Sequence, residues 1–259
     1  MDLNELKKSL DSGAKEFATR LGQRLQENGT AKNFLDWLLR YDAFNRGFPG
    51  AAAQLAGRIT EMVDHFGDIE AERIASRVLA AITDEFLDRS TGAITLHSAL
   101  RRELVIFSWV NLSSQSRQEA LQVVKTYDPL RKEVLRATRI GYGLETTNPF
   151  SGVFAGLGFF AASETSGSTE FVTLNRYMNT TWPDLKTAMQ EATDDQGRAL
   201  YAWVVDHQDL EADHDAFAFS SIELAVQYLG SDEERTAALA EVNKGIQEFF
   251  AMADRILLC

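Results

Sequence analysis

The sequence predicts an all-α protein of about eight to ten helices, forming a single domain over residues 1–259. Three observations predict this fold class. Apolar residues recur mostly at intervals of three and four, which is the spacing of one helix face. The 259 residues include only four prolines, so few positions interrupt a helix. Alternating apolar and polar runs, which are typical of half-buried strands, do not occur in the sequence.

Five segments with helical spacing make up the first part of the chain. Residues that favour turns stand at their borders: Asn28-Gly29, Pro49-Gly50 and Gly67. The segments span residues 3–26, 30–44, 50–66, 69–88 and 96–110.

Five more segments follow, and the last two are the longest. The sequence GYGLETTNPF separates the first of them from the second, and DDQG precedes the fourth. We expect residues 148–164 and 169–192 to form separate helices. The full set spans residues 116–140, 148–164, 169–192, 198–230 and 232–258.

The composition limits the possible partners and locations. The net charge is −12 and the pI about 4.8, so the surface would repel nucleic acid and anionic membranes. The one cysteine, Cys259, has no partner for an internal disulfide, and we expect a reducing compartment. The first residues lack the apolar core of a signal peptide, and no apolar run is long enough to span a bilayer. These features predict a cytoplasmic protein.

A short acidic stretch carries two of the four histidines. In DHQDLEADHDAF, residues 206–217, His207, Glu211 and His214 stand at positions i, i+4 and i+7 of a predicted helix. These positions fall within roughly 60° of one another, on a side of the helix that is otherwise apolar. Three such side chains are able to form one wall of a metal site in a bundle. The alternative is a solvated acidic face.

Three further residues are candidate ligands. Glu164 is the one ionisable residue of the apolar, glycine-rich segment 148–164. Small residues in that segment let a neighbouring helix or a substrate come close. Glu85 and His97 would lie about 120° apart on one unbroken helix, but a break at Gly92 would let both turn inward. The fourth histidine, His65, lies beside Gly67 at a predicted helix end.

These motifs, in this order, resemble the haem-oxygenase-like diiron oxidases and oxygenases. The resemblance rests on a Glu in a DE-containing helix, a His before an SxL run, a lone Glu after a small and apolar helix, and the motif H-x-x-x-D/E-x-x-H. It covers residues 48–228 and implies a haem-oxygenase-like helical bundle. It also implies six metal ligands: Glu85, His97, Glu164, His207, Glu211 and His214.

The chain departs from this family in two places. Glu211 stands where the family often has Asp, which moves the carboxylate by one methylene. The spacing from Glu85 to His97 is long, so Asp84 or Asp88 is an alternative ligand to Glu85. Related branches of the fold, the thiaminase-II-like and coenzyme-PQQ-synthase-like proteins, bind no metal, and they are not expected to carry all six residues.

The resemblance implies an O2-dependent oxidoreductase with two Fe(II) ions, or one Fe and one Mn, bound by three carboxylates and three imidazoles. The expected reaction is N-oxygenation, desaturation or C–C cleavage of a small carboxylate such as an amino acid, in a biosynthetic pathway. The alternatives are a fatty-acid oxidative decarboxylase of the same family, or a metal-free helical protein that acts as an interaction module. The resemblance also implies a homodimer.

Several residues are candidates for substrate binding. Phe160 and Trp203 would line the cavity, although such side chains are more often part of an ordinary core. Arg58 and the Arg101–Arg102 pair would hold a substrate carboxylate, because the guanidinium fork matches it.

Overall fold

The computed structural model describes residues 1–27, 29–86 and 96–258, apart from the side chains at positions 84 and 209–212. All regular elements in this described part are helical, and an isolated bridge joins Thr193 to Ala199. The all-α prediction is therefore confirmed. The twelve α-helices exceed the expected eight to ten, and a short 3-10 turn, η1 (Thr83–Glu85), accompanies them.

The helices follow one another with short connections. They are α1 (Leu3–Glu27), α2 (Ala31–Phe44), α3 (Phe48–Thr60), α4 (Val63–Phe66), α5 (Asp68–Ile82), α6 (His97–Ser113), α7 (Arg117–Thr126), α8 (Asp128–Gly141), α9 (Pro149–Thr181), α10 (Pro183–Glu191), α11 (Ala202–Tyr228) and α12 (Asp232–Leu257).

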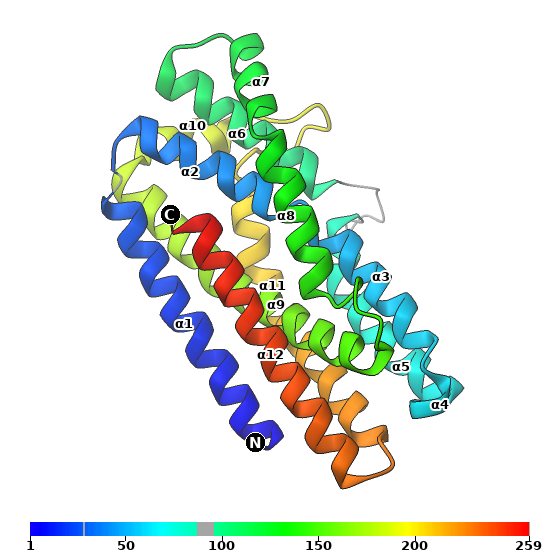
Figure 1. Ribbon diagram of the computed structural model, residues 1–259. Coiled ribbons are helices and arrows are strands. Elements are labelled where there is room, and N and C mark those ends of the chain that lie inside the picture. The colour runs from blue at the N-terminus through cyan, green and yellow to red at the C-terminus, as the bar shows by residue number, and fades with distance from the viewer. Residues whose placement is uncertain (28, 87–95, 259) are drawn as a thin grey trace.

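Helix α9 is the centre of the bundle and packs against α1, α11 and α12 (Figure 1). Helices α2, α6, α7 and α10 lie at one end of the bundle, which is the top in Figure 1. The buried apolar residues form one cluster that runs from Leu6 to Leu257. Within the described residues, no helix has the length and apolar character needed to cross a membrane.

The small residues of α9 bring α12 unusually close. A Cβ atom added to Gly158 would lie 1.9 Å from the carbonyl oxygen of Val242, and one added to Gly245 would lie 1.9 Å from that of Ala155. Only glycine fits at such a backbone contact. The neighbour that the glycine-rich segment admits is therefore helix α12.

Several predicted boundaries differ from the structure. The helix predicted over residues 69–88 ends at Ile82, where the 3-10 turn η1 follows. Residues 165–168 do not separate two helices, because α9 continues through them to Thr181, and Pro183 begins the next helix. The predicted segment 50–66 is divided between α3 and α4. The segment 116–140 is divided at Tyr127, after which α8 begins at Asp128 with Pro129 in its first turn.

Candidate metal centre

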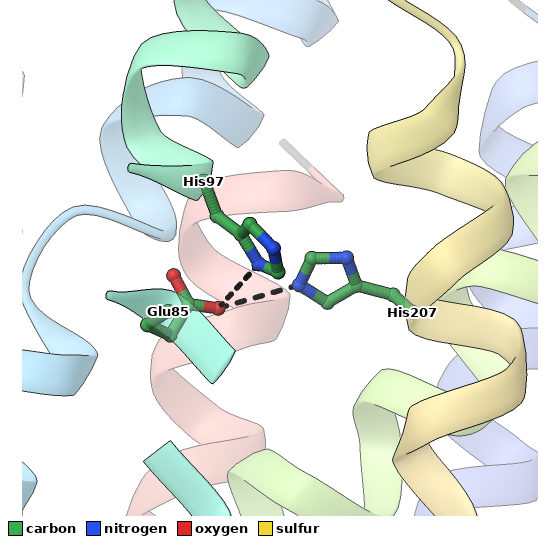
Figure 2. Close-up of side chains that lie close together, drawn as sticks. All are labelled: Glu85, His97 and His207. Atoms are coloured by element: carbon green, nitrogen blue, oxygen red, sulfur yellow. Dashed lines mark hydrogen bonds and ion pairs between the residues drawn. The ribbon is translucent and has the colours of Figure 1, made fainter. Parts of the chain in front are cut away.

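Three of the predicted ligands converge on one point from three elements. Glu85 ends η1, His97 is the first residue of α6, and His207 lies in the first half of α11. Glu85 Oε1 lies 3.3 Å from His207 Nε2 and 3.7 Å from His97 Nδ1. Figure 2 shows the carboxylate facing both rings. One ligand atom from each residue lies within 4.8 Å of the other two.

The backbone determines which nitrogen of His207 faces this point. His207 Nδ1 lies 2.6 Å from the carbonyl oxygen of Trp203, and since a carbonyl only accepts, Nδ1 carries the proton. This leaves Nε2 as the nitrogen that faces Glu85. Its distance of 3.3 Å from Glu85 Oε1 suits a proton or a cation held between the two atoms. Histidines that bind metals commonly make this same outer hydrogen bond.

Packing fixes the orientation of both rings. The His207 ring stacks on Phe171, with centroids 4.4 Å apart and planes 27° apart. The ring centroids of His97 and His207 lie 4.8 Å apart, and both side chains are buried. The nitrogen atoms are therefore held in place by the surrounding core before any ion binds.

Glu85 is held in its charged form. Burial alone would raise its pKa, but the contacts with His207 and then His97 outweigh burial and hold the pKa well below the ordinary range. A carboxylate at neutral pH thus faces the two imidazoles.

A second pair of predicted ligands lies on α9 and α11. His214 Nδ1 is 3.6 Å from Glu164 Oε2, and both residues line the cavity that also contains Glu85 and His207. Burial, and next the negative charge of Glu85, raise the pKa of Glu164. The two carboxyl groups therefore interact unfavourably unless a proton or a cation compensates them.

The remaining ligand candidates lie outside the described part of the chain. These are the side chains of Glu211 and Asp84 and the whole of Asp88. Five of the six predicted ligands are therefore located, in one group of three and one pair. His65, the histidine left out of the prediction, is exposed on α4 and lies 3.9 Å from Glu234.

The located donors fit a divalent transition-metal ion. Two ligands bound at about 2.1 Å from one metal lie about 3.0–3.4 Å apart. The distance from Glu85 Oε1 to His207 Nε2, 3.3 Å, falls in this range, and the distance to His97 Nδ1, 3.7 Å, lies slightly above it. Nitrogen and oxygen donors without sulfur suit iron, manganese or zinc. The protonated outer nitrogen of His207 supports the same interpretation.

The structure separates the residues proposed for substrate binding. Trp203 lines the cavity. Phe160 does not, since it is fully buried in the core with its ring 6.3 Å from that of Tyr142. Arg58 is also away from the cavity: it donates to the carbonyl oxygens of Gly143 and Thr146 and so ties α3 to the connection between α8 and α9. The structure brings Arg101 to the cavity instead.

One buried acid was missed in the sequence. Glu170 lines the same cavity, accepts hydrogen bonds from Tyr41 at 3.2 Å and Ser166 at 2.8 Å, and is 3% exposed. Burial raises its pKa to about 7. The signal was the helical spacing of the α9 residues that line the cavity: Ser163, Glu164, Gly167, Glu170 and Phe171. The predicted break at 165–168 hid this spacing.

The centre thus combines buried nitrogen and oxygen donors with a cavity of about 70 Å³ inside a helical bundle. Comparison of the chain with protein-family models, with curated proteins and with solved structures finds no match.

Proposed function

We propose that this protein is a non-haem diiron oxidoreductase with a haem-oxygenase-like bundle, which uses O2 to oxidise a small carboxylate. The observation that carries the proposal is the orientation of His207. Its Nδ1 is paired with the Trp203 carbonyl, and its Nε2 faces Glu85, which is the arrangement of a metal-binding histidine.

Two groups of residues would hold the ions. Glu85, His97 and His207 would hold one ion, and Glu164 and His214, together with Glu211 as the sequence predicts, would hold the other. Iron bound there, or iron with manganese, would supply the activation of O2. The negative charge of the carboxylates favours divalent ions, and the imidazoles add neutral donors.

The cavity residues of the chain would control water and protons. Five aromatic side chains in the lining would keep bulk water out: Phe44, Phe48, Phe171, Trp203 and Phe249. Glu170 is close to half protonated at neutral pH, because burial raises its pKa to about 7. It would therefore hold or release a proton within the cavity without large cost in free energy.

The size of the cavity supports a small substrate. A volume of about 70 Å³ has room for several water molecules. An amino acid or another short carboxylate suits this space better than a medium-chain fatty acid does.

Iron loading under anaerobic conditions tests the proposal. We expect the wild-type chain to take up about two irons and to give a transient visible absorption when mixed with O2. His207→Ala should lose about half of the iron, because it removes one of the three donors of the group that Glu85, His97 and His207 form. Metal analysis and stopped-flow spectra measure both quantities.

The exposed His65 provides a matched control. His65→Ala removes an imidazole that is not part of the centre and should leave the iron content and the spectrum unchanged. The proposal fails if the wild-type chain takes up no iron, or if His207→Ala and His65→Ala load equally.

A further inference from the structure

A buried cluster of charges lies beside the cavity. Asp42 is 1% exposed and faces three guanidinium groups. Its carboxylate oxygens lie 2.9 Å from Arg131 Nη2, 3.4 Å from Arg46 Nε and 3.3 Å from Arg101 Nε. One carboxylate thus forms ion pairs with three guanidinium groups. Arg131 has a second partner in Asp128 at 2.7 Å.

Arg101 is the member of this cluster that reaches the cavity. It lies one turn after His97 on α6, is 3% exposed, and lines the cavity with Glu85 and His207. Among the described residues, its buried Nη2 has no hydrogen-bond partner. Arg101 Nε donates to Asp42 Oδ1 at 3.3 Å, so the guanidinium is held in place by Asp42 through one nitrogen while Nη2 is left without a partner among the described residues.

Trp203 carries a second buried N–H donor without a hydrogen-bond partner among the described residues. The guanidinium of Arg101 lies over its ring, with Cζ 5.5 Å from the ring centroid. The indole Nε1 of Trp203 is buried and, within the described part of the chain, also lacks a hydrogen-bond partner. Buried donors in folded proteins nearly always have an acceptor. Two residues that line one cavity thus each carry a buried donor without an acceptor among the described residues, and a bound oxyanion would supply one.

The charges of the lining indicate what kind of acceptor this is. The described lining residues include three carboxyl groups, Glu85, Glu164 and Glu170, but Arg101 is their one lysine or arginine. A guanidinium with an unpaired N–H binds an oxyanion through charge-assisted hydrogen bonds. An anionic group in this cavity is attracted by Arg101 and repelled by the ionised carboxylates of the lining, so it binds most favourably beside Arg101.

We propose that Arg101, together with the indole N–H of Trp203, binds the carboxylate of the substrate and so sets which end of it points toward Glu85 and His207. The assignment of this carboxylate ligand as the substrate rests on the proposed function. The anion site itself is a property of the cavity and is testable without iron.

The test uses the iron-free chain and sodium butyrate as the probe, at constant ionic strength. The four tryptophans give separate indole ¹⁵N–¹H signals, and Trp203→Phe identifies the one from Trp203. We expect butyrate to shift this signal in a saturable way, whereas uncharged butyramide does not. In Arg101→Gln, affinity should fall by about tenfold or more. The neighbouring Arg102→Gln serves as the matched control and should bind as the wild-type chain does.

Arg101→Lys provides a second variant that keeps the charge next to Asp42, in case Arg101→Gln does not fold. It should bind butyrate more weakly than the wild-type chain, because lysine lacks the fork. Unchanged binding in a folded Arg101 variant, or no shift of the Trp203 signal in the wild-type chain, would overturn the proposal. Iron uptake is measured separately: butyrate binding without iron uptake refutes the diiron function alone, and iron uptake without butyrate binding refutes the anion site alone.

Discussion

At the scale of single residues, Glu170 links the cavity to the stability of the fold. Its carboxyl group accepts from Tyr41 and Ser166 in a buried site, and burial raises its pKa from 4.5 to about 7. The folded chain therefore holds this proton more tightly than the unfolded chain. Its contribution to stability is fully present below about pH 4.5 and is lost as the pH rises through 7.

Glu170→Gln should remove this pH dependence, because an amide stays neutral and keeps a similar shape. Between pH 5 and pH 8 the free energy of unfolding should fall less in the variant than in the wild-type chain, by about 2 kcal/mol. Urea unfolding at the two pH values measures the difference. Glu61→Gln, at an exposed position, should follow the wild-type profile. An equal fall in Glu170→Gln would show that this carboxyl is not the group that titrates.

The sequence predicted the histidines and glutamates of the centre, but it did not predict which arginine lines the cavity. His207 and His214 share a helix face by their spacing alone. Arg58 and Arg101 look alike in sequence. Arg58 donates to the carbonyl oxygens of Gly143 and Thr146, which only the folded chain brings near it.

At the scale of elements, α9 shows why one predicted break is absent. The Ser/Thr/Gly run of residues 163–170 has poor helix propensity, and its hydroxyl groups would favour turns. In the structure Ser166, Ser168 and Thr169 donate to carbonyl oxygens three residues earlier within the helix. Packing of α9 against α1, α11 and α12 then outweighs the local preference. Helical spacing predicted α1, α5 and α12 because each buries one apolar face.

Gly158→Ala should strongly destabilise the contact between α9 and α12. The added Cβ would lie 1.9 Å from the carbonyl oxygen of Val242, and backbone has to move to relieve the overlap. We expect a loss of about 2–3 kcal/mol, measured by urea unfolding.

Gly57→Ala is the matched control, since a Cβ there meets nothing within 4 Å on an exposed side of α3. It should stabilise the chain by about 0.5–1 kcal/mol, because alanine favours a helix interior. If the two substitutions changed the free energy of unfolding equally, the contact between α9 and α12 would not need a glycine at position 158.

At the scale of the whole molecule, the apolar core surrounds a centre that gathers several carboxyl groups. Glu85 and Glu164 share one cavity inside a cluster that extends from Leu6 to Leu257. The negative charge of Glu85 contributes to the raised pKa of Glu164. Since α6, α9, α11 and the η1 turn all supply donors, an ion bound at the centre would link distant parts of the chain.

Manganese should therefore stabilise the whole fold. Mn(II) avoids oxidation during the measurement, and free Mn(II) at about 100 times its Kd should add about 2.7 kcal/mol to the free energy of unfolding. Thermal unfolding with Mn(II) and with a chelator gives the difference. His207→Ala should show a smaller increase. The same unfolding temperature with and without Mn(II) in the wild-type chain would contradict binding at this centre.

The separation of Glu85 and His97 into different elements affects how relatives of this chain are to be sought. α5 ends at Ile82, Glu85 belongs to η1, and α6 begins at His97, so no single helix register ties the two residues together. His207 and His214, by contrast, occupy one continuous helix, where inserting or deleting a single residue would rotate one of them away. A search pattern should therefore allow a variable gap after the glutamate and a fixed spacing between the last two histidines.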